Sequence, residues 1–397
     1  MNEWKQVILT EVTSKIGDGL HGTPKYDEKG DYYFINGNNL YQGNISVKTD
    51  TKKVSKYEFE KYRKSLSENT ILLGINGTIG NVAFYNNEKC ILGKSACYIN
   101  VNEKVNRRFL YYNLLNKDFQ IFLEGIATGT TILNVPLKGL REYSFLLPPL
   151  PEQERISEVL SSLDDKIDLL HRNNKTLEQL AETLFRQWFV EEAEEDFYEV
   201  KLGEYVNLVS GYSYRSVDLN SSTKALVTLK NFDRTGGFRH DGFKEYTGKY
   251  KMDQVVVSGD LIVAHTDITQ EAEVLGNPAI VISTDKYETL IISTDLVKVV
   301  PTSYLSKVYL YFLMKTDEFK HYCLGASNGT TVLHLSKKAL PEYDFKLPSA
   351  ELVERFTAIA EPLLEKININ QKHIQQLESL RDTLLPKLMS GVVRVEN

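Results

Sequence analysis

The sequence has 397 residues, a formal net charge of −6, 42% hydrophobic residues and 25% charged residues. A chain of this length exceeds what one hydrophobic core supports, so we expect at least two domains, and the ordinary composition excludes a largely disordered protein. No stretch approaches about 18 consecutive apolar residues, and residues 1–10 lack a basic region followed by an apolar run. We therefore expect a cytoplasmic protein that does not bind a membrane.

The charge is distributed unevenly along the chain. Residues 1–150 contain more Lys and Arg than Asp and Glu, whereas residues 151–197 are strongly acidic. Binding to nucleic acid depends on local patches that face the phosphates, so the total charge neither supports nor excludes it. The three cysteines and seven histidines show no spacing typical of a disulfide framework or a metal site, which predicts a chain without a metal.

Short aromatic and β-branched runs separated by Gly, Asn and Asp fill residues 1–100 and 198–300, and they predict strands and turns. Residues 105–124 and 304–324 have helical spacing, and the proline-rich segment 146–151 predicts an extended connection. The same order of elements thus occurs twice.

An internal repeat decides the architecture. Gly-Thr-Thr-Ile-Leu at 129–133 recurs as Gly-Thr-Thr-Val-Leu at 329–333, and Glu-Tyr-Ser-Phe-Leu-Leu-Pro at 142–148 recurs as Glu-Tyr-Asp-Phe-Lys-Leu-Pro at 342–348. The spacing is 200 residues in both cases. Before residue 100 the similarity fades, leaving only loose matches such as 34–40 with 227–232. Each half therefore has a variable front part and a shared back part.

A long amphipathic run follows each half. After Pro151 it continues to about residue 189, and both runs carry apolar residues at alternating spacings of three and four, the pattern of a coiled-coil seam. The predicted seam residues are Ile156, Leu160, Leu163, Ile167, Leu170, Asn174, Leu177 and Leu184 in the first helix and Leu363, Ile367, Ile374, Leu377 and Leu384 in the second.

The simplest arrangement pairs the two helices with each other in antiparallel orientation, because each follows its own globular domain. Asn174, Asn370 and Arg381 interrupt the seam. They either fix the register of the pair or lie where the helices splay into solvent, and the sequence leaves both open. Pro362 is expected to kink or delay the second helix.

We therefore expect an α+β protein in which two mixed α/β domains stand in tandem repeat, separated by two long helices that form an antiparallel coiled coil. The expected segments are a first head at 1–150, a central helix at 151–197, a second head at 198–348 and a C-terminal helix at 349–397.

Together these features resemble the specificity subunit of type I restriction-modification enzymes. The resemblance extends over essentially the whole chain and rests on the loops 17–24 and 77–80, on 129–131, and above all on the segment 147–156, Leu-Pro-Pro-Leu-Pro-Glu-Gln-Glu-Arg-Ile. The second half departs from the pattern: it has Leu-Pro-Ser-Ala-Glu at 347–351 and Ser-Gly-Tyr at 210–212. These departures make the contacts of the second head harder to place.

The resemblance implies that the two heads are target recognition domains that bind double-stranded DNA. Each would recognise one half of a bipartite, asymmetric target. The helices would bind modification subunits, two of them, which carry S-adenosylmethionine and methylate adenine at N6. Restriction subunits would cleave DNA in the full complex.

The chain itself lacks the motifs of catalysis. It has no Asp/Asn-Pro-Pro-Tyr/Phe motif for a flipped base, no phosphate-binding loop with a following Lys-Ser/Thr, and no Ser/His/Asp or HExxH constellation. We expect a non-catalytic chain that binds no cofactor of its own. The alternative is a coiled-coil interaction scaffold whose heads bind ligands other than DNA.

Side chains that recognise base edges are Arg, Lys, Asn, Gln, Ser and Thr on protruding turns. The candidate DNA-binding residues are His21, Thr23, Lys25, Tyr26, Asn36, Asn38, Asn39 and Lys94 in the first head and Tyr212, Tyr214, Arg215, Lys230, Asn231, Arg234, Arg239 and His240 in the second. Asn and Gly are also common wherever a turn needs them, so turn chemistry is the competing interpretation. Thr130, Thr131, Thr330 and Thr331, with Lys138 and Lys338, occur in both halves and cannot distinguish two target sequences.

Overall fold

The structure is a computed structural model that describes residues 4–193, 197–234, 237–269, 272–282, 284, 286–329 and 332–395. Its contacts divide the chain into two compact units, residues 1–168 with 375–397 and residues 169–374. Both boundaries cross the long helices rather than lying at their ends, because side chains of these helices belong to the hydrophobic cores of both units. In the described part of the chain, no helix combines the length and apolarity that crossing a membrane requires.

The first head is built on an antiparallel four-stranded sheet with the order β2-β10-β7-β8. These strands are β2 (Thr13–Asp18), β10 (Ala96–Val101), β7 (Thr70–Asn76) and β8 (Thr78–Phe84). Helices α2 (Arg107–Leu115) and α3 (Lys117–Ile126) pack against β8, and α4 (Leu137–Arg141) packs against β2. A separate pair joins β1 (Lys5–Ile8) to β11 (Ser144–Leu147), so both ends of the head meet.

The variable part of the first head adds a small mixed sheet. Its order is β6-β3-β9, in which β3 (Tyr32–Ile35) runs parallel to β9 (Cys90–Leu92) and antiparallel to β6 (Lys53–Val54). Helix α1 (Lys56–Tyr62) contacts β9. The two-stranded ribbon of β4 (Leu40–Tyr41) and β5 (Asn44–Ile45) lies beside β8.

The second head repeats the main sheet and the terminal strand pair of the first. Its main sheet has the order β13-β21-β17-β19, and β12 pairs with β24 as β1 does with β11. A mixed sheet of order β15-β14-β20-β16 contains the parallel pair β14 and β20. The elements are β12 (Tyr198–Lys201), β13 (Val206–Ser210), β14 (Lys224–Val227), β15 (Lys244–Glu245), β16 (Val255–Val256), β17 (Leu261–Ala264), β18 (Thr266–Asp267), β19 (Pro278–Ile280), β20 (Thr289–Ile292), β21 (Leu296–Pro301), α6 (Lys307–Met314), α7 (Asp317–Gly325), β22 (Ser327–Asn328), β23 (Leu333–Leu335), α8 (Ala339–Glu342) and β24 (Asp344–Leu347).

Each helical run expected at 105–124 and 304–324 is in fact two helices. The break falls at Asn116 in the first head and at Lys315 and Thr316 in the second. Asn116 and Thr316 have extended backbone angles, and the Thr316 side chain accepts a hydrogen bond from the N–H of Phe319, so it caps the second helix. In both heads a polar residue with extended backbone angles therefore separates two helices within one apolar run.

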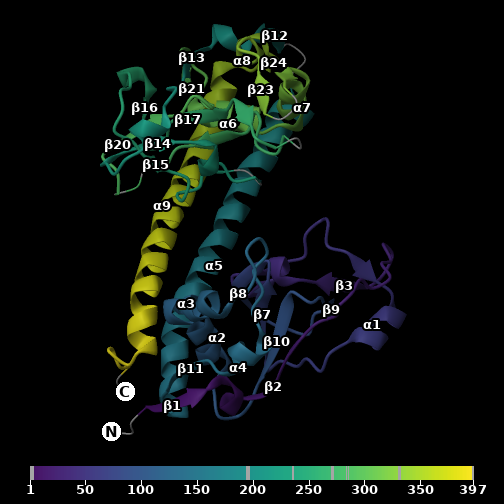
Figure 1. The fold of residues 1–397 in the computed structure, drawn as a ribbon. Helices are drawn as coiled ribbons and strands as arrows, with labels where there is room; N and C mark the ends of the chain where they lie inside the picture. The colour runs from purple at the N-terminus through teal and green to yellow at the C-terminus, as the bar shows by residue number, and fades with distance from the viewer. Residues whose placement is uncertain are drawn as a thin grey trace. The chain divides into compact units, whose positions relative to one another are not determined.

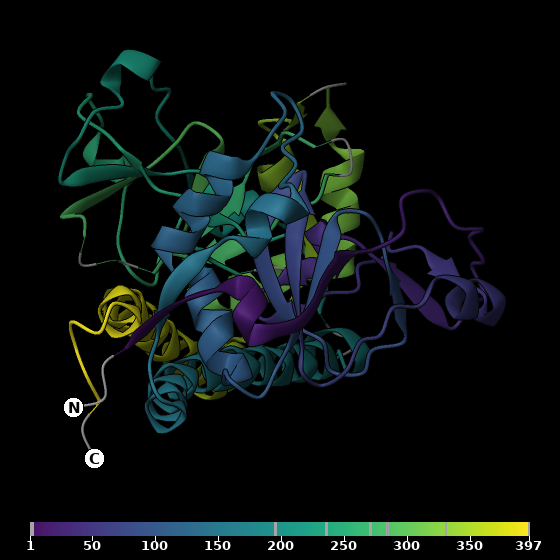
Figure 2. The same ribbon diagram turned by 60° about the horizontal axis from the view of Figure 1, so that its bottom comes forward.

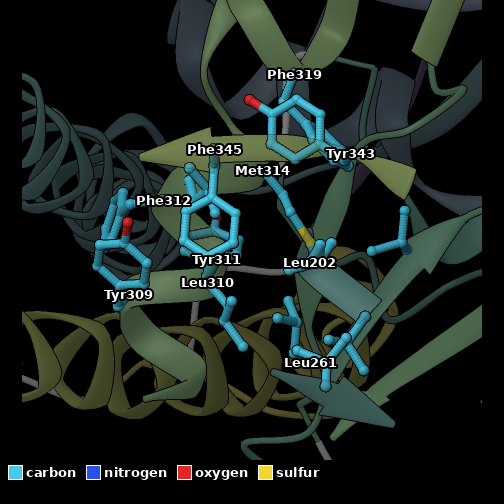
Figure 3. Close-up of a cluster of buried hydrophobic side chains, with 14 of the residues drawn as sticks. Leu202, Leu261, Tyr309, Leu310, Tyr311, Phe312, Met314, Phe319, Tyr343 and Phe345 are labelled. Carbon is cyan, nitrogen blue, oxygen red and sulfur yellow. The ribbon is translucent and has the colours of Figure 1, made fainter. Parts of the chain in front are cut away.

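The core of the second unit is rich in aromatic residues, most of them from α6, α7 and the segment that leads into α9 (Figure 3). Tyr309, Phe312 and Phe319 are fully buried, and Phe185 from α5 contacts the rings of Tyr309 and Phe356. Large aromatic side chains bury the most apolar area per residue, so these contacts join the head to both helices. The three cysteines of the chain are buried and none forms a disulfide.

The two long helices are α5 (Leu150–Arg186), which ends in a short π-helical turn at Gln187–Glu191, and α9 (Ala350–Met389) (Figure 1). In the first unit, Ile156 and Leu160 of α5 share a core with Leu385 and Leu388 of α9. In the second unit the opposite ends of the same helices share a core, so the helices form an antiparallel pair. α9 runs without interruption through Pro362, where a delay or kink was expected. A second view of both units is given in Figure 2.

None of the predicted seam residues is exposed. Six of them are buried, namely Ile156, Leu160, Ile167, Leu170, Asn174 and Ile374, and the others are half-buried. The side chain of Asn370 donates a hydrogen bond of 2.7 Å from its Nδ2 to Oδ1 of Asn174, and both residues are buried. Arg381 instead donates to the Asp164 carboxylate at 3.0 Å. The two asparagines therefore pair inside the seam rather than facing solvent.

Candidate nucleic-acid interface

Several turns of the first head meet at one edge of its sheets, which we call the loop edge. It consists of residues 18–21, 36–39, 76–79 and 93–95. The N–H of Leu20 donates to the Leu92 carbonyl at 2.7 Å, and the N–H of Gly93 donates to the Ile35 carbonyl at 2.8 Å. The N–H of Ile75 donates to the Ser95 carbonyl at 2.9 Å. Backbone hydrogen bonds thus join the segments into one surface.

The turn at 36–39 is held by the asparagine that ends it. Asn39 is buried, its Oδ1 accepts from the N–H of Asn36 at 3.0 Å, and its Nδ2 donates to the Ser46 carbonyl at 3.0 Å. The N–H of Gly37 donates to Oγ of Ser95 at 2.9 Å, which ties the turn to the neighbouring loop. Asn38, which lies between Gly37 and Asn39, is exposed.

The second head contains the same loop edge, built from residues 210–213, 228–231, 266–269 and 293–295. The N–H of Ser293 donates to the Val227 carbonyl at 2.9 Å, and the N–H of His265, just before β18, donates to the Asp295 carbonyl at 2.8 Å. Tyr212 forms a parallel bridge with Ser293, as Leu20 does with Gly93. Every segment of the first loop edge therefore has a counterpart in the second.

The turn at 228–231 repeats the turn at 36–39. Asn231 is fully buried, its Oδ1 accepts from the N–H of Thr228 at 2.8 Å, and its Nδ2 donates to the Arg239 carbonyl at 2.8 Å. Lys230 precedes it and is exposed, as Asn38 is. The parallel strands confirm this equivalence, because Ile35 pairs with Leu92 and Val227 pairs with Ile292.

Two glycines occupy equivalent positions where the chain passes close to its neighbour. A Cβ at Gly19 would collide with the backbone carbonyls of Leu92 and Gly93, and a Cβ at Gly211 would collide with the carbonyl of Ser293. Glycine is required at both places by space and not by a positive φ. The Ser-Gly-Tyr segment thus fills the place of the glycine-rich loop of the first head.

Three pairs of exposed side chains stand at equivalent positions of the two loop edges. They are His21 and Ser213, Asn38 and Lys230, and Lys94 and Thr294. The residues differ within every pair, whereas the buried asparagines that hold the turns are the same. A common scaffold therefore presents a different set of polar side chains in each head.

The loop 129–133 lies next to the first loop edge. The N–H of Gly77 donates to the Leu133 carbonyl at 2.9 Å, and all five residues of the loop are exposed. Gly129 has φ of +98°, and Gly329 has φ of +121°, so glycine is favoured at both by the backbone. Thr130 and Thr131 are exposed, whereas Thr330 and Thr331 lie outside the described residues.

Comparison with known proteins finds relatives over most of the chain. Residues 1–179 match the family described as type I restriction modification DNA specificity domain. The type I restriction enzyme MjaIX specificity subunit of Methanocaldococcus jannaschii is 26% identical over 354 residues, 82% of this chain and 78% of that protein. Residues 1–179 thus match that domain family, and most of the chain is similar to a type I restriction enzyme specificity subunit.

Two further members of this family are similar over most of the chain. The type I restriction enzyme HindI specificity subunit of Haemophilus influenzae is 24% identical over 360 residues, 72% of this chain and 77% of that protein. The crystal structure of the type I restriction-modification system S subunit from M. genitalium has a TM-score of 0.59 at 20% identity and covers 98% of this chain and 96% of that one, which shows a common fold.

The segment 147–156, which lies within the matched residues, has a structural role. Glu152 accepts two hydrogen bonds of 2.7 Å from Arg394 and one of 3.1 Å from the Trp4 indole. Buried Gln153 donates to the Pro148 carbonyl at 2.8 Å and accepts from the N–H of Asn106 at 2.7 Å. In the second copy Leu352 and Val353 occupy these positions and pack into the aromatic core. Apolar packing replaces the polar network there.

The candidate residues of the first head fall into three groups. His21, Asn38 and Lys94 are exposed on the loop edge, with His21 paired to Asp18. Asn36 and Asn39 hold the turn: Asn36 accepts from Oγ of Ser95 at 2.9 Å, and the Asn39 amide is fully used inside the fold.

Thr23, Lys25 and Tyr26 are exposed away from this edge. There the N–H of Lys25 donates to the Glu58 carboxylate, and the backbone of Tyr26 forms a bridge with Val54.

Most candidates of the second head already have partners. Arg215 pairs with Asp218 at 3.4 Å, Arg234 with Glu273 at 3.0 Å and Arg239 with Asp241. Tyr214 accepts a hydrogen bond of 2.7 Å from Lys244, and Asn231 is buried.

His240 packs against the rings of Phe238 and Phe243, and burial lowers its pKa, so it is a neutral packing residue. Lys230 is exposed on the loop edge. Tyr212 belongs to the same edge, because its backbone forms a bridge with Ser293.

Asn39 and Asn231 are therefore explained by turn chemistry, and we leave them out of the interface proposed below. Sequence reasoning missed Ser213 and Thr294, which complete the exposed pairs. Ser213 lies 192 residues after its counterpart His21, and Thr294 lies 200 residues after Lys94. The repeat visible in the sequence shows only the offset of 200. Among the described residues, no group of His, Cys, Asp and Glu is placed to hold a metal ion.

Proposed function

We propose that each head recognises one half of a bipartite, asymmetric DNA target through its loop edge. The observation that carries the proposal is the pair of equivalent loop edges with different exposed side chains. A shared backbone scaffold gives the two heads the same mode of docking, and the differing side chains give them different base preferences. Thr130 and Thr131 recur in the second half, so any contact that they make is common to both half-sites.

We further propose that α5 and α9 dock two copies of one partner, the modification subunit. Helix α5 exposes Leu169 and Leu180, which are 42% and 57% accessible, and α9 exposes Ile369 and Leu380, which are 48% and 46% accessible. The members of each pair are 11 residues apart and lie on one face of their helix. The two pairs are also related by the repeat of 200 residues. Apolar residues repeated on the outside of both helices favour two identical partners.

We assign no chemical step to this chain. The modification subunits would supply S-adenosylmethionine and transfer its methyl group to adenine N6, and restriction subunits would join them for cleavage. The role of the chain is to bind the target and to set the distance between the two half-sites, which the coiled coil fixes.

The test is to co-express the chain with its cognate modification subunit and map N6-methyladenine across the genome. A two-part asymmetric motif is expected. Replacing residues 1 to about 145 by the equivalent part of another specificity subunit should change one half of this motif and leave the other half and the spacer unchanged. If both halves or the spacer change while the helices stay the same, the heads are not modular. An assembled complex without any motif favours a scaffold whose heads bind other ligands.

The docking surface is tested separately by the double substitution Leu169→Asp and Leu180→Asp. Purification with a tagged modification subunit should recover much less of this variant than of Gln179→Asp, an exposed position on α5 off that face. Circular dichroism checks that the helices remain folded. Equal recovery of the two variants contradicts the proposed docking face.

A further inference from the structure

The turns at 36–39 and 228–231 are the same device in both heads. In each, a buried asparagine accepts from the backbone N–H three residues earlier and donates to a carbonyl of the following segment. Both its hydrogen-bonding groups are used inside the fold, so it is not available to a ligand. Its function is to hold the backbone of the residue before it.

The residue before the buried asparagine is Asn38 in the first head and Lys230 in the second. Both are exposed, and in the part of the chain that the structure describes neither side chain takes part in a hydrogen bond or an ion pair. A polar side chain on a braced turn, with no partner in its own fold, has the geometry that direct readout needs. The turn fixes the backbone while the side-chain donors stay free.

The chemistry of the two residues differs in a definite way. The carboxamide of Asn both donates and accepts, which matches N6 and N7 of adenine, whereas the ammonium of Lys only donates, which matches O6 and N7 of guanine. The other exposed pairs are less informative, because His21 is paired to Asp18 and a threonine hydroxyl such as that of Thr294 can bond to several bases without preference.

We propose that Asn38 and Lys230 are equivalent specificity-determining positions, and that Asn38 recognises adenine and Lys230 guanine in their respective half-sites. This inference rests on the proposed function of the loop edges. It assigns one base in each half of the target to one named side chain and separates that role from the bracing role of the asparagine that follows.

The test exchanges the two side chains in the complex with the modification subunit. Asn38→Lys should shift one position of one half-site from adenine to guanine, and Lys230→Asn should shift one position of the other half-site from guanine to adenine. A good bidentate contact discriminates by roughly 10-fold or more, which both methylome mapping and competition binding with duplex DNA resolve.

Matched controls carry the same substitutions elsewhere in each head. Asn69→Lys changes an exposed residue at the opposite end of β7, about 20 Å from the loop edge for a seven-residue strand. Lys249→Asn changes an exposed residue of the second head outside its loop edge. Neither control should alter the motif.

The outcomes separate the inference from the proposed function. If the unaltered complex gives no bipartite motif, the proposed function itself fails. If it gives one and both exchanges leave every base of it unchanged, the inference is overturned. Should Asn38→Lys abolish binding, Asn38→Ala and Lys230→Ala provide the second measurement: each should relax the preference at one position, and retention of full preference by both overturns the inference.

Discussion

The buried pair of Asn174 and Asn370 makes a quantitative prediction about the coiled coil. Their side chains are 9% and 1% accessible and share one hydrogen bond of 2.7 Å. Asn370→Leu alone removes the donor and leaves the Asn174 amide buried without that partner. Such an orphaned polar group costs about 1–3 kcal/mol, and Asn174→Leu alone should cost a similar amount.

The double variant behaves differently because no orphan remains. Replacing both partners by apolar groups of similar size is close to neutral and can be stabilising. We therefore expect the double Leu variant to have a higher free energy of unfolding than either single variant, with a coupling of about 1–3 kcal/mol between the two positions. Its cost is lost specification of the register, since a polar pair in an apolar seam disfavours shifted alignments.

The assay is urea denaturation of the full chain followed by far-UV circular dichroism, for the two single variants and the double variant. Asn173→Leu is the matched control, since Asn173 is the exposed neighbour of Asn174 on α5, and it should change the free energy of unfolding by less than about 0.5 kcal/mol. Additive losses in the double variant would refute the reasoning, because the two amides would then act independently.

Three further predictions concern the heads and the assembled complex. Glu152→Gln should lower the free energy of unfolding by about 1–3 kcal/mol at neutral pH. Arg394 holds the Glu152 pKa below its ordinary value of 4.5, so the stabilisation by Glu152 is present above pH 4.5. In denaturation curves, the difference between the original chain and the variant should disappear as the pH falls through the lower pKa of the folded state. Gly19→Ala and Gly211→Ala should each lower the free energy of unfolding by about 1–3 kcal/mol and so lower the midpoint of thermal unfolding. Gly22→Ala should leave the midpoint unchanged, because the space around Gly22 is open. Affinity of the assembled complex for duplex DNA should fall steeply between low and moderate salt in filter-binding titrations, and constant affinity would count against phosphate contacts.

The helices and the back parts of the heads could be predicted from the sequence because their signals are local or repeated. The seam spacing from Ile156 onward follows directly from helix geometry, and the repeat at 129–148 and 329–348 aligns without a gap. The break at Asn116 was missed, since a single residue with extended backbone angles inside an apolar run does not disturb the helical period.

The loop edge could not be predicted at the level of single residues. Asn36, Asn38 and Asn39 are chemically alike in the sequence, yet one binds the neighbouring loop, one is exposed and one is buried. Their roles depend on hydrogen bonds to Ser46 and to Ser95, and Ser95 is 59 residues from Asn36 in the sequence. For the same reason the ion pairs that occupy the arginines of the second head were not visible from composition.

The fading of the repeat before residue 100 has a physical explanation in the parallel strands. In both heads the turn and the following loop are joined by one parallel pair, β3 with β9 and β14 with β20, so their positions are fixed by backbone hydrogen bonds that any residue can make. The chain between the paired strands is eight residues longer in the second head, and this difference leaves the loop edge intact. Few residues are therefore common to both loop edges, namely Gly19 and Asn39 with their counterparts Gly211 and Asn231. The exposed positions and the intervening segments differ between the heads, as the proposed recognition of two different half-sites requires.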